Sequence, residues 1–202
     1  VFSRDAQTIN DADFANKARF ESIRLSNSAN TLILGISAAA ATNGLEVTGG
    51  TGNDDIDASA LGEAVTINSG SGDDELTGST EGDTFNFAGD LTSADTVAGG
   101  TGTDTLTFTD GNSATDDLDN VTEVEIIILG DAATSVTTLN SLVAHKDSLT
   151  VDGTALSTAN ALIWNGGAET GGSFSVTGGA GNDSVIGGSR NDTLTGGAGA
   201  DT

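Results

Sequence analysis

The chain has 202 residues, of which 30 are acidic and 6 are basic, so its formal net charge is −24; it contains 29 Gly and no Pro, Cys, Met or Tyr. This charge excludes nucleic acid as a partner, because phosphate binding needs a basic patch, and it disfavours an anionic membrane surface. Without bound cations, charge repulsion and the scarcity of aromatic residues would favour an unfolded chain. No apolar run approaches the roughly 20 residues that a membrane helix requires.

Residues 1–30 form a lead-in segment that holds most of the basic side chains, namely Arg4, Lys17, Arg19 and Arg24. Their density predicts a solvated, partly helical segment. The alternative is a docking surface for the acidic body of the protein or for an anionic surface glycan.

Residues 31–110 are predicted to form a first module, because nonapeptides recur within them. The segments 49–57 (GGTGNDDID) and 99–107 (GGTGTDTLT) share Gly at positions one, two and four, Asp at six and an aliphatic residue at eight. The segment 69–77 (SGSGDDELT) differs only at its first residue, whereas 78–86 (GSTEGDTFN) has Glu81 in place of the fourth Gly. Two further segments, 58–66 and 90–98, are degenerate copies.

Period nine suits neither an amphipathic helix nor an alternating strand. It suits a coil made of a six-residue turn and a short strand, so that two nonapeptides complete one coil. Acidic residues at position six should then form two edges: Asp54, Asp74 and Asp95 on one, and Glu63, Asp83 and Asp104 on the other. The residues at position eight should form an inward ladder: Ile56, Val65, Leu76, Phe85, Val97 and Leu106.

Residues 111–202 are predicted to be a second, related module. Its segment 117–129 (DLDNVTEVEIIIL) aligns without gaps on 13–25, and 161–185 resembles 31–56. Trp164 thus takes the place of Leu34 and should pack in the core or at a coil edge. Internal duplication favours a stacked solenoid. An insertion at 130–160 contains Leu139, Leu142 and Val143 at helical spacing, which predicts a short helix near 138–146 that ends near His145, the only His.

The last 25 residues, 178–202, read GGAGNDSVI, GGSRNDTLT and GGAGADT in tandem. Their sixth positions are Asp183, Asp192 and Asp201. Because two nonapeptides complete one coil, turns eighteen residues apart should stack on the same edge and bring Asp183 next to Asp201. Because the chain stops inside a repeat, the second module is expected to continue beyond residue 202.

These residue types in this pattern favour a calcium site. Gly reaches the backbone angles that let a tight turn offer its carbonyl oxygens to an ion. The Asp adds carboxylate oxygen, and calcium takes about 6–8 oxygen ligands. The alternative is a glycine-rich solenoid in which Asp only caps turns.

The pattern GGxGxDxUx, with U apolar, resembles the calcium-binding nonapeptide of the RTX (repeats-in-toxin) family. The resemblance implies an all-β fold, a parallel β-roll/β-helix solenoid with calcium-binding nonapeptide turns that hold several Ca²⁺ ions. The implied ligand positions are Gly49, Thr51, Asp54, Gly70, Gly72, Asp74, Asp83, Asp95, Gly99, Gly102, Asp104, Gly178, Ala180, Asp183, Asp192, Gly197, Gly199 and Asp201.

Catalytic motifs are not found in the sequence. One His excludes an HExxH metalloprotease site, and neither a GxSxG elbow nor a Walker loop occurs. We therefore expect that the chain is not an enzyme.

The resemblance implies a protein that is exported unfolded by type I secretion and folded by extracellular calcium. Extracellular calcium-binding modules typically have dissociation constants of about 10⁻⁴–10⁻³ M, so their sites are empty in the cytosol. The duplicated modules look more like bacterial S-layer proteins or large adhesins than toxins. We expect a calcium-dependent structural segment of a secreted cell-surface protein that self-associates in a lattice or fibre. The alternative is the RTX calcium domain of a secreted enzyme or toxin whose catalytic domain lies elsewhere.

Overall fold

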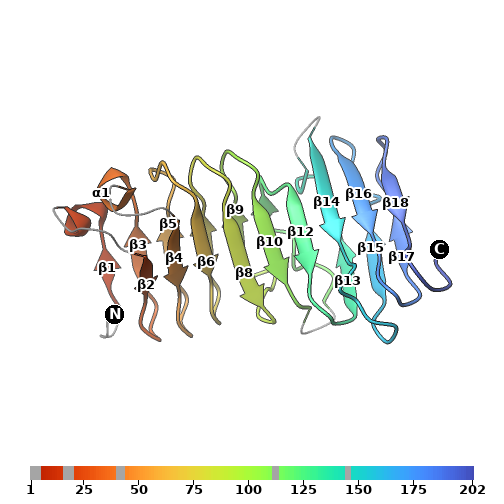
Figure 1. The fold of residues 1–202 in the computed structure, drawn as a ribbon, viewed down its shortest axis with the longest axis horizontal. Coiled ribbons are helices and arrows are strands. Elements are labelled where there is room, and N and C mark those ends of the chain that lie inside the picture. The colour runs from red at the N-terminus through yellow and green to blue at the C-terminus, as the bar shows by residue number, and fades with distance from the viewer. Residues whose placement is uncertain (1–5, 16–20, 40–43, 111–113, 144–146) are drawn as a thin grey trace. The chain divides into compact units, whose positions relative to one another are not determined.

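The computed structural model describes residues 6–15, 21–39, 44–110, 114–143 and 147–202. Short strands in parallel pairs dominate them, which confirms the all-β parallel solenoid (Figure 1). The first strands are β1 (Thr8–Ile9), β2 (Ser22–Arg24), β3 (Thr31–Ile33), β4 (Leu45–Thr48), β5 (Asp55–Asp57), β6 (Val65–Asn68), β7 (Glu75–Thr77), β8 (Thr84–Ala88) and β9 (Thr96–Ala98). The others are β10 (Thr105–Phe108), β11 (Val121–Thr122), β12 (Ile126–Leu129), β13 (Thr134–Thr137), β14 (Ser148–Asp152), β15 (Leu162–Asn165), β16 (Ser173–Thr177), β17 (Ser184–Ile186) and β18 (Thr193–Thr195).

Helical structure is confined, within the described part of the chain, to the 3-10 turn η1 (Asp11–Phe14) and the single turn α1 (Ile36–Ala39). None of the helices in these ranges has the length and apolar character needed to cross a bilayer.

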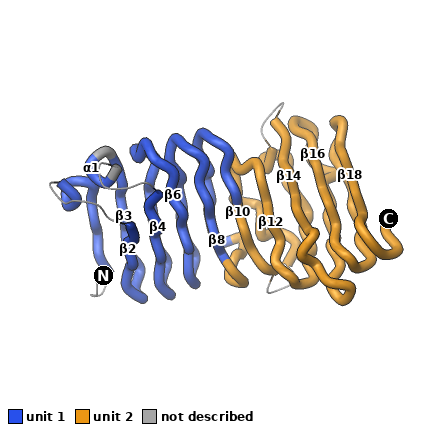
Figure 2. Tube along the Cα trace, viewed as in Figure 1, with its two compact units in different colours: residues 1–87, 94–105 blue, residues 88–93, 106–202 orange. Residues whose placement is uncertain are grey.

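The chain divides into two compact units, residues 1–87 with 94–105 and residues 88–93 with 106–202 (Figure 2). In the first unit, odd-numbered strands pair in the order β1-β3-β5-β7-β9 and even-numbered strands in the order β2-β4-β6-β8. In the second unit the orders are β13-β15-β17 and β10-β12-β14-β16-β18. Each coil thus contributes one strand to each of two sheets. The two modules predicted from sequence duplication have other boundaries and stay a prediction.

In-register parallel pairing stacks equivalent positions of successive repeats. Leu76 pairs with Ile56 on one side and with Val97 on the other. Because alternate residues of a strand point to opposite faces, the eighth residue of each repeat points inward. The predicted ladder is confirmed, since Ile56, Val65, Leu76, Phe85, Val97 and Leu106 are each at most 1% exposed.

The lead-in is partly helical, as predicted, because its described residues include the 3-10 turn η1, but it also contributes strands to the solenoid. Its described residues wind into the first coils, where Ile9, Phe14 and Ile23 are buried and β2 pairs with β4. Apolar side chains at alternate strand positions outweigh the charge density here, because β2 exposes Arg24 and buries Ile23. Arg4, Lys17 and Arg19 lie outside the described residues.

The helix predicted near 138–146 is wrong for residues 138–143. These residues form a turn in which the N–H of Leu142 donates to the carbonyl of Leu139 at 3.3 Å. The three apolar residues do not share one buried face, because Leu142 and Val143 are buried while Leu139 is 45% exposed. Their helical spacing in the sequence was therefore misleading. Residues 144–146, with His145, lie outside the described residues.

Trp164 packs in the core of the second unit, as predicted. It is 1% exposed and lies edge-on to Phe174, with the ring centroids 5.5 Å apart. The eighth positions of the last two repeats differ from the ladder, because β17 and β18 are the end strands of their sheets. Leu194 is 44% exposed and Val185 is half-buried.

This difference gives a matched pair of substitutions in the same repeat position. Leu76→Ala leaves a cavity in a closed core and should lower the free energy of unfolding by about 2–5 kcal/mol. Leu194→Ala should lower it by less than about 1 kcal/mol, because its side chain is already half in water. Urea unfolding in calcium-containing buffer measures both; equal losses would contradict the inward ladder.

Candidate calcium sites

Three pairs of stacked turns have the same construction. Each pair joins two nonapeptide turns on one edge of a unit, and the pairs are 49–54 with 69–74, 78–83 with 99–104, and 178–183 with 196–201. We call these the turn pairs, and in each we call the earlier turn first and the later turn second.

An Asp carboxylate at position six connects the two turns of each pair. The N–H of Asp54 donates to Oδ1 of Asp74 at 2.8 Å, and the N–H of Asp83 donates to Oδ1 of Asp104 at 2.7 Å. The third pair repeats this bond between Asp183 and Asp201 at 3.0 Å. A backbone bond accompanies it, because the residue after the second Asp donates its N–H to the carbonyl of the first Asp. In the first pair, the N–H of Glu75 donates to the carbonyl of Asp54 at 2.8 Å.

The first turns close on themselves through the other carboxylate oxygen. Oδ2 of Asp54 accepts the N–H of Gly50 at 2.9 Å, and Oδ2 of Asp183 accepts that of Gly179 at 2.7 Å. Ser79 donates to Asp83 in the same way. The position-six Asp of a first turn is therefore fixed by its own backbone.

The second turns have another backbone conformation. Gly70 and Gly72, at positions two and four, have φ of +94° and +130°, and the corresponding residues of the other second turns also have positive φ. Only Gly adopts these angles without strain. Oδ2 of Asp74 is buried and has no hydrogen-bond partner among the described groups.

The turns stack so closely that carbonyl oxygens of one turn lie against the glycines of the next. A Cβ added to Gly70 would lie 2.0 Å from the carbonyl oxygen of Gly50, and one added to Gly199 would lie 1.9 Å from that of Gly181. Glycine at positions two and four thus leaves a cradle between turns, lined by backbone oxygen.

The electrostatics of this cradle are unfavourable for bare carboxylates. Burial raises the pKa of Asp74 to about 7, although the N–H of Asp54 lowers it, and the nearby carboxylates of Asp54 and Asp95 raise it further. Burial likewise raises the pKa of Asp54 and of Asp83, against the lowering effect of their hydrogen bonds. A stack of buried anions therefore needs protons or cations to be stable.

The residues fit calcium on three observations: the glycine cradle, the oxygen donors and the unsatisfied Oδ2 of Asp74. Within the described ranges, no three Asp, Glu or His side chains converge on one point. A cation held between turns must therefore take most of its ligands from backbone carbonyls, which calcium accepts.

The structure places all the predicted ligand residues in turns at coil edges. The predicted ligand Asp residues of the first unit are buried. Asp95 extends the column of Asp54 and Asp74, because its Oδ1 accepts the N–H of Asp74 at 2.8 Å. Asp183 is buried, whereas Asp192 is half-buried and Asp201 is exposed. Metal ligation by these residues stays a prediction.

The edge position proposed for Glu63 is wrong. Glu63 is exposed, and Oδ1 of Asp83 instead accepts the N–H of Val65 at 2.7 Å. The degenerate turn before β6 therefore contributes backbone to this edge but no carboxylate.

Sequence reasoning missed two kinds of buried polar residue. Asn30 extends the column of position-six side chains from Asp54 into the lead-in, because its N–H donates to Asp54. The sequence pattern that could have indicated it is an Asn followed two residues later by an apolar residue, Leu32, which is buried. Glu169 is fully buried and joins the insertion to a turn, because it accepts the N–H groups of Val143 and Gly171 at 3.3 and 2.7 Å. Its position lies outside any repeat, so no sequence signal pointed to it.

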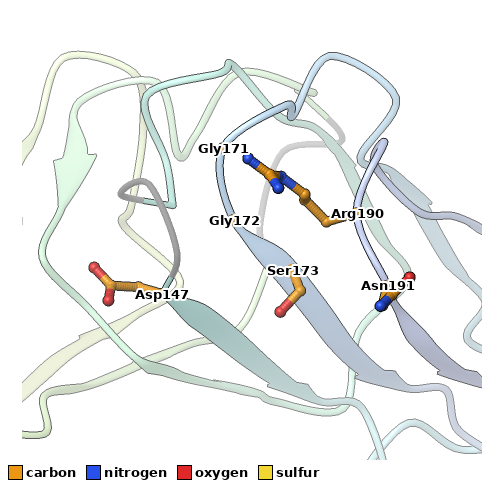
Figure 3. A pocket seen from close by; sticks show the side chains of 6 residues that line it. All are labelled: Asp147, Gly171, Gly172, Ser173, Arg190 and Asn191. Atoms are coloured by element: carbon orange, nitrogen blue, oxygen red, sulfur yellow. The ribbon is translucent and has the colours of Figure 1, made fainter.

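A cavity of about 290 Å³ in the second unit lies apart from the turn pairs (Figure 3). The Arg190 side chain extends toward Gly171 on one side, and Asp147 lies on the other. Arg190 Nε donates to the carbonyl of Thr170 at 3.1 Å, so the Arg at position four of this repeat places a cationic side chain over the preceding turn.

The comparison with protein families matches residues 61–86, 91–113 and 177–202 to the RTX calcium-binding nonapeptide repeat. No curated protein and no solved structure shows significant similarity to the chain. The matched ranges cover less than half of the chain, and the turn 49–54 shares the geometry although it lies outside them. The chain therefore contains RTX calcium-binding nonapeptide repeats, and these form β-roll coils.

The raised pKa of Asp74 predicts how the calcium-free fold responds to pH. Between its unfolded pKa of 3.8 and its folded pKa of about 7, the folded state binds more protons, so stability must decrease as the pH rises through this window. Circular dichroism melts of protein freed of calcium beforehand, in calcium-free buffer at pH 4 to 7, should show a Tm that falls as the pH rises until the fold is lost, and Asp74→Asn should flatten the slope. Asp116→Asn, at an exposed site, should leave it unchanged; a Tm that rises with pH in the parent chain would contradict the assignment.

Proposed function

We propose that this chain is a calcium-dependent structural segment of a secreted bacterial cell-surface protein, and that it folds and assembles when it binds extracellular calcium. The coarser statement, an RTX calcium-binding β-roll segment, already follows from the repeats. The three congruent turn pairs with buried carboxylates carry the proposal. They make folding dependent on a cation that is scarce inside the cell and abundant outside it.

Calcium would be held by the position-six carboxylates and the turn carbonyls of each pair. When bound, it supplies positive charge that compensates the buried anions. Binding to the folded state alone stabilises that state by RT ln(1 + [L]/Kd), about 1.4 kcal/mol per site at ten times Kd. The net charge of −24 keeps the calcium-free chain extended and soluble, which suits export in the unfolded state.

A structural role is supported by the outer surface of the second unit. Ile163 and Ile186 lie on the outward face of the sheet β13-β15-β17 and are 52% and 54% exposed. Contiguous exposed apolar surface marks association sites, and we infer that these two side chains lie in such a surface. Two copies with a high negative charge would repel each other until calcium reduces that charge, so assembly would follow binding.

Calcium removal should unfold most of the chain. EGTA should reduce the β signal in circular dichroism, and calcium should restore it. Asp183→Asn keeps the shape of the side chain but removes its charge, so the calcium concentration at half-refolding should rise by on the order of tenfold. Asp116→Asn is the matched control and should not shift this midpoint; an unchanged spectrum in EGTA would overturn the calcium dependence.

Assembly should depend on both calcium and the apolar face. At millimolar calcium the chain should form ordered assemblies visible by electron microscopy. The double variant Ile163→Asp/Ile186→Asp should bind calcium with unchanged affinity but stay monomeric in sedimentation, because like charges then line the contact. Monodisperse parent chain at millimolar calcium would count against the lattice or fibre and would favour the calcium domain of a secreted enzyme.

A further inference from the structure

Residues 25–33 (LSNSANTLI) form a turn and strand that have the geometry of a nonapeptide repeat without its sequence. The N–H of Leu25 donates to the carbonyl of Thr48 at 2.8 Å, as the N–H of Gly49 does to Asn68 at 2.9 Å. The N–H of Asn30 donates to Oδ1 of Asp54 at 2.9 Å, which repeats the bond between Asp54 and Asp74. Asn30 therefore occupies position six of this turn, where the repeats carry Asp.

The amide nitrogen of Asn30 lies at the centre of the turn and binds three oxygens. Nδ2 donates to the carbonyls of Ser26 and Ser28, at 3.2 and 2.5 Å, and to Oδ1 of Asp54 at 2.7 Å. The orientation of the amide is fixed, because its Oδ1 accepts the Ser26 hydroxyl at 2.9 Å and the N–H of Gln7 at 3.4 Å. Asn30 itself is 4% exposed.

These three oxygens are of the same kinds as those assigned to calcium in the turn pairs. Ser26 and Ser28 hold positions two and four of their turn, and their carbonyls face the glycines of the next turn. A Cβ added to Gly50 would lie 2.0 Å from the Ser26 oxygen. The third oxygen is the position-six carboxylate of that next turn.

We propose that the Asn30 amide takes the place of calcium between turns 25–30 and 49–54, so that this pair closes without metal. This inference rests on the proposed calcium dependence of the other turn pairs. A neutral NH₂ group shares its two protons among the inward carbonyls of Ser26 and Ser28 and one oxygen of Asp54, and it adds no negative charge to the column. Hydrogen bonds to a charged carboxylate are among the stronger ones.

A metal-free turn pair gives the solenoid a starting point that does not depend on the ion. In a stacked repeat protein, each coil is stabilised by its neighbour, so an existing coil lowers the cost of ordering the next. The coil closed by Asn30 would offer Asp54 in its folded position to the first calcium-dependent turn, 69–74.

The test converts the amide to a ligand. Asn30→Asp places a carboxylate against the Ser26 and Ser28 carbonyls and Asp54, which repel it unless a cation intervenes. Isothermal titration and native mass spectrometry should show one more calcium per chain in this variant than in the parent. Asn27→Asp is the matched control, because Asn27 lies in the same turn but is exposed; it should add no ion.

Hydrogen exchange in EGTA gives a second test, which measures the protection of backbone amides and does not require the variant to gain a calcium site. In the parent chain the amides of Asn30 and Asp55 should stay protected after those of the turn pair 178–183/196–201 have exchanged. Asn30→Ala should reduce that protection by about tenfold or more without changing the number of calcium ions bound.

The outcomes separate this inference from the proposed function. If the parent chain binds no calcium, the proposed function fails. If the parent binds calcium but Asn30→Asp binds the same number of ions, or if the amides of Asn30 and Asp55 exchange in EGTA as fast as the others, then the amide does not replace the metal.

Discussion

The bond between an Asp carboxylate and the backbone N–H of the adjacent turn is the interaction on which the rest of this structure depends. Asp54, Asp83 and Asp183 each donate an N–H to the Asp of the next turn. The bond sets the register of the turns, and the register stacks the eighth residues into a closed core. Without it, three-residue strands such as β5 and β7 would have little to fix their pairing.

The same bond creates an electrostatic problem. It buries the carboxylates of Asp54, Asp74 and Asp83, and burial raises the pKa of each of these groups. Each backbone N–H offsets only part of the desolvation, since a buried charge needs compensation by an opposite charge. A fold built on this bond is therefore conditional: protons, a cation or an internal donor must complete it. In our proposal the chain uses an internal donor at Asn30 and leaves the other turn pairs to calcium.

This conditional stability joins structure to biological role. A chain that is too acidic to compact alone can remain unfolded where calcium is scarce and fold where it is abundant. The outward face that carries Ile163 and Ile186 exists only once β15 and β17 are paired. Folding and association would thus respond to one ion, which would suit the proposed role of a segment that assembles outside the cell.

The amino-acid sequence by itself determined the solenoid, the positions of its turns and the inward ladder, because a nine-residue period with Gly and Asp at fixed places admits few other folds. It also identified the Asp residues that share an edge, since spacing along the chain becomes stacking when coils repeat. It misplaced Glu63 and the helix near 138–146, where no strict period constrains the chain. Only the tertiary structure decided that Asn30 and Glu169 are buried and what each of them binds, because each has a partner in a part of the chain 24 or 26 residues away. The tertiary structure also decided which turns carry positive-φ glycines, since GGTGND and GGTGTD have nearly the same sequence, and the neighbour in the stack selects the conformation.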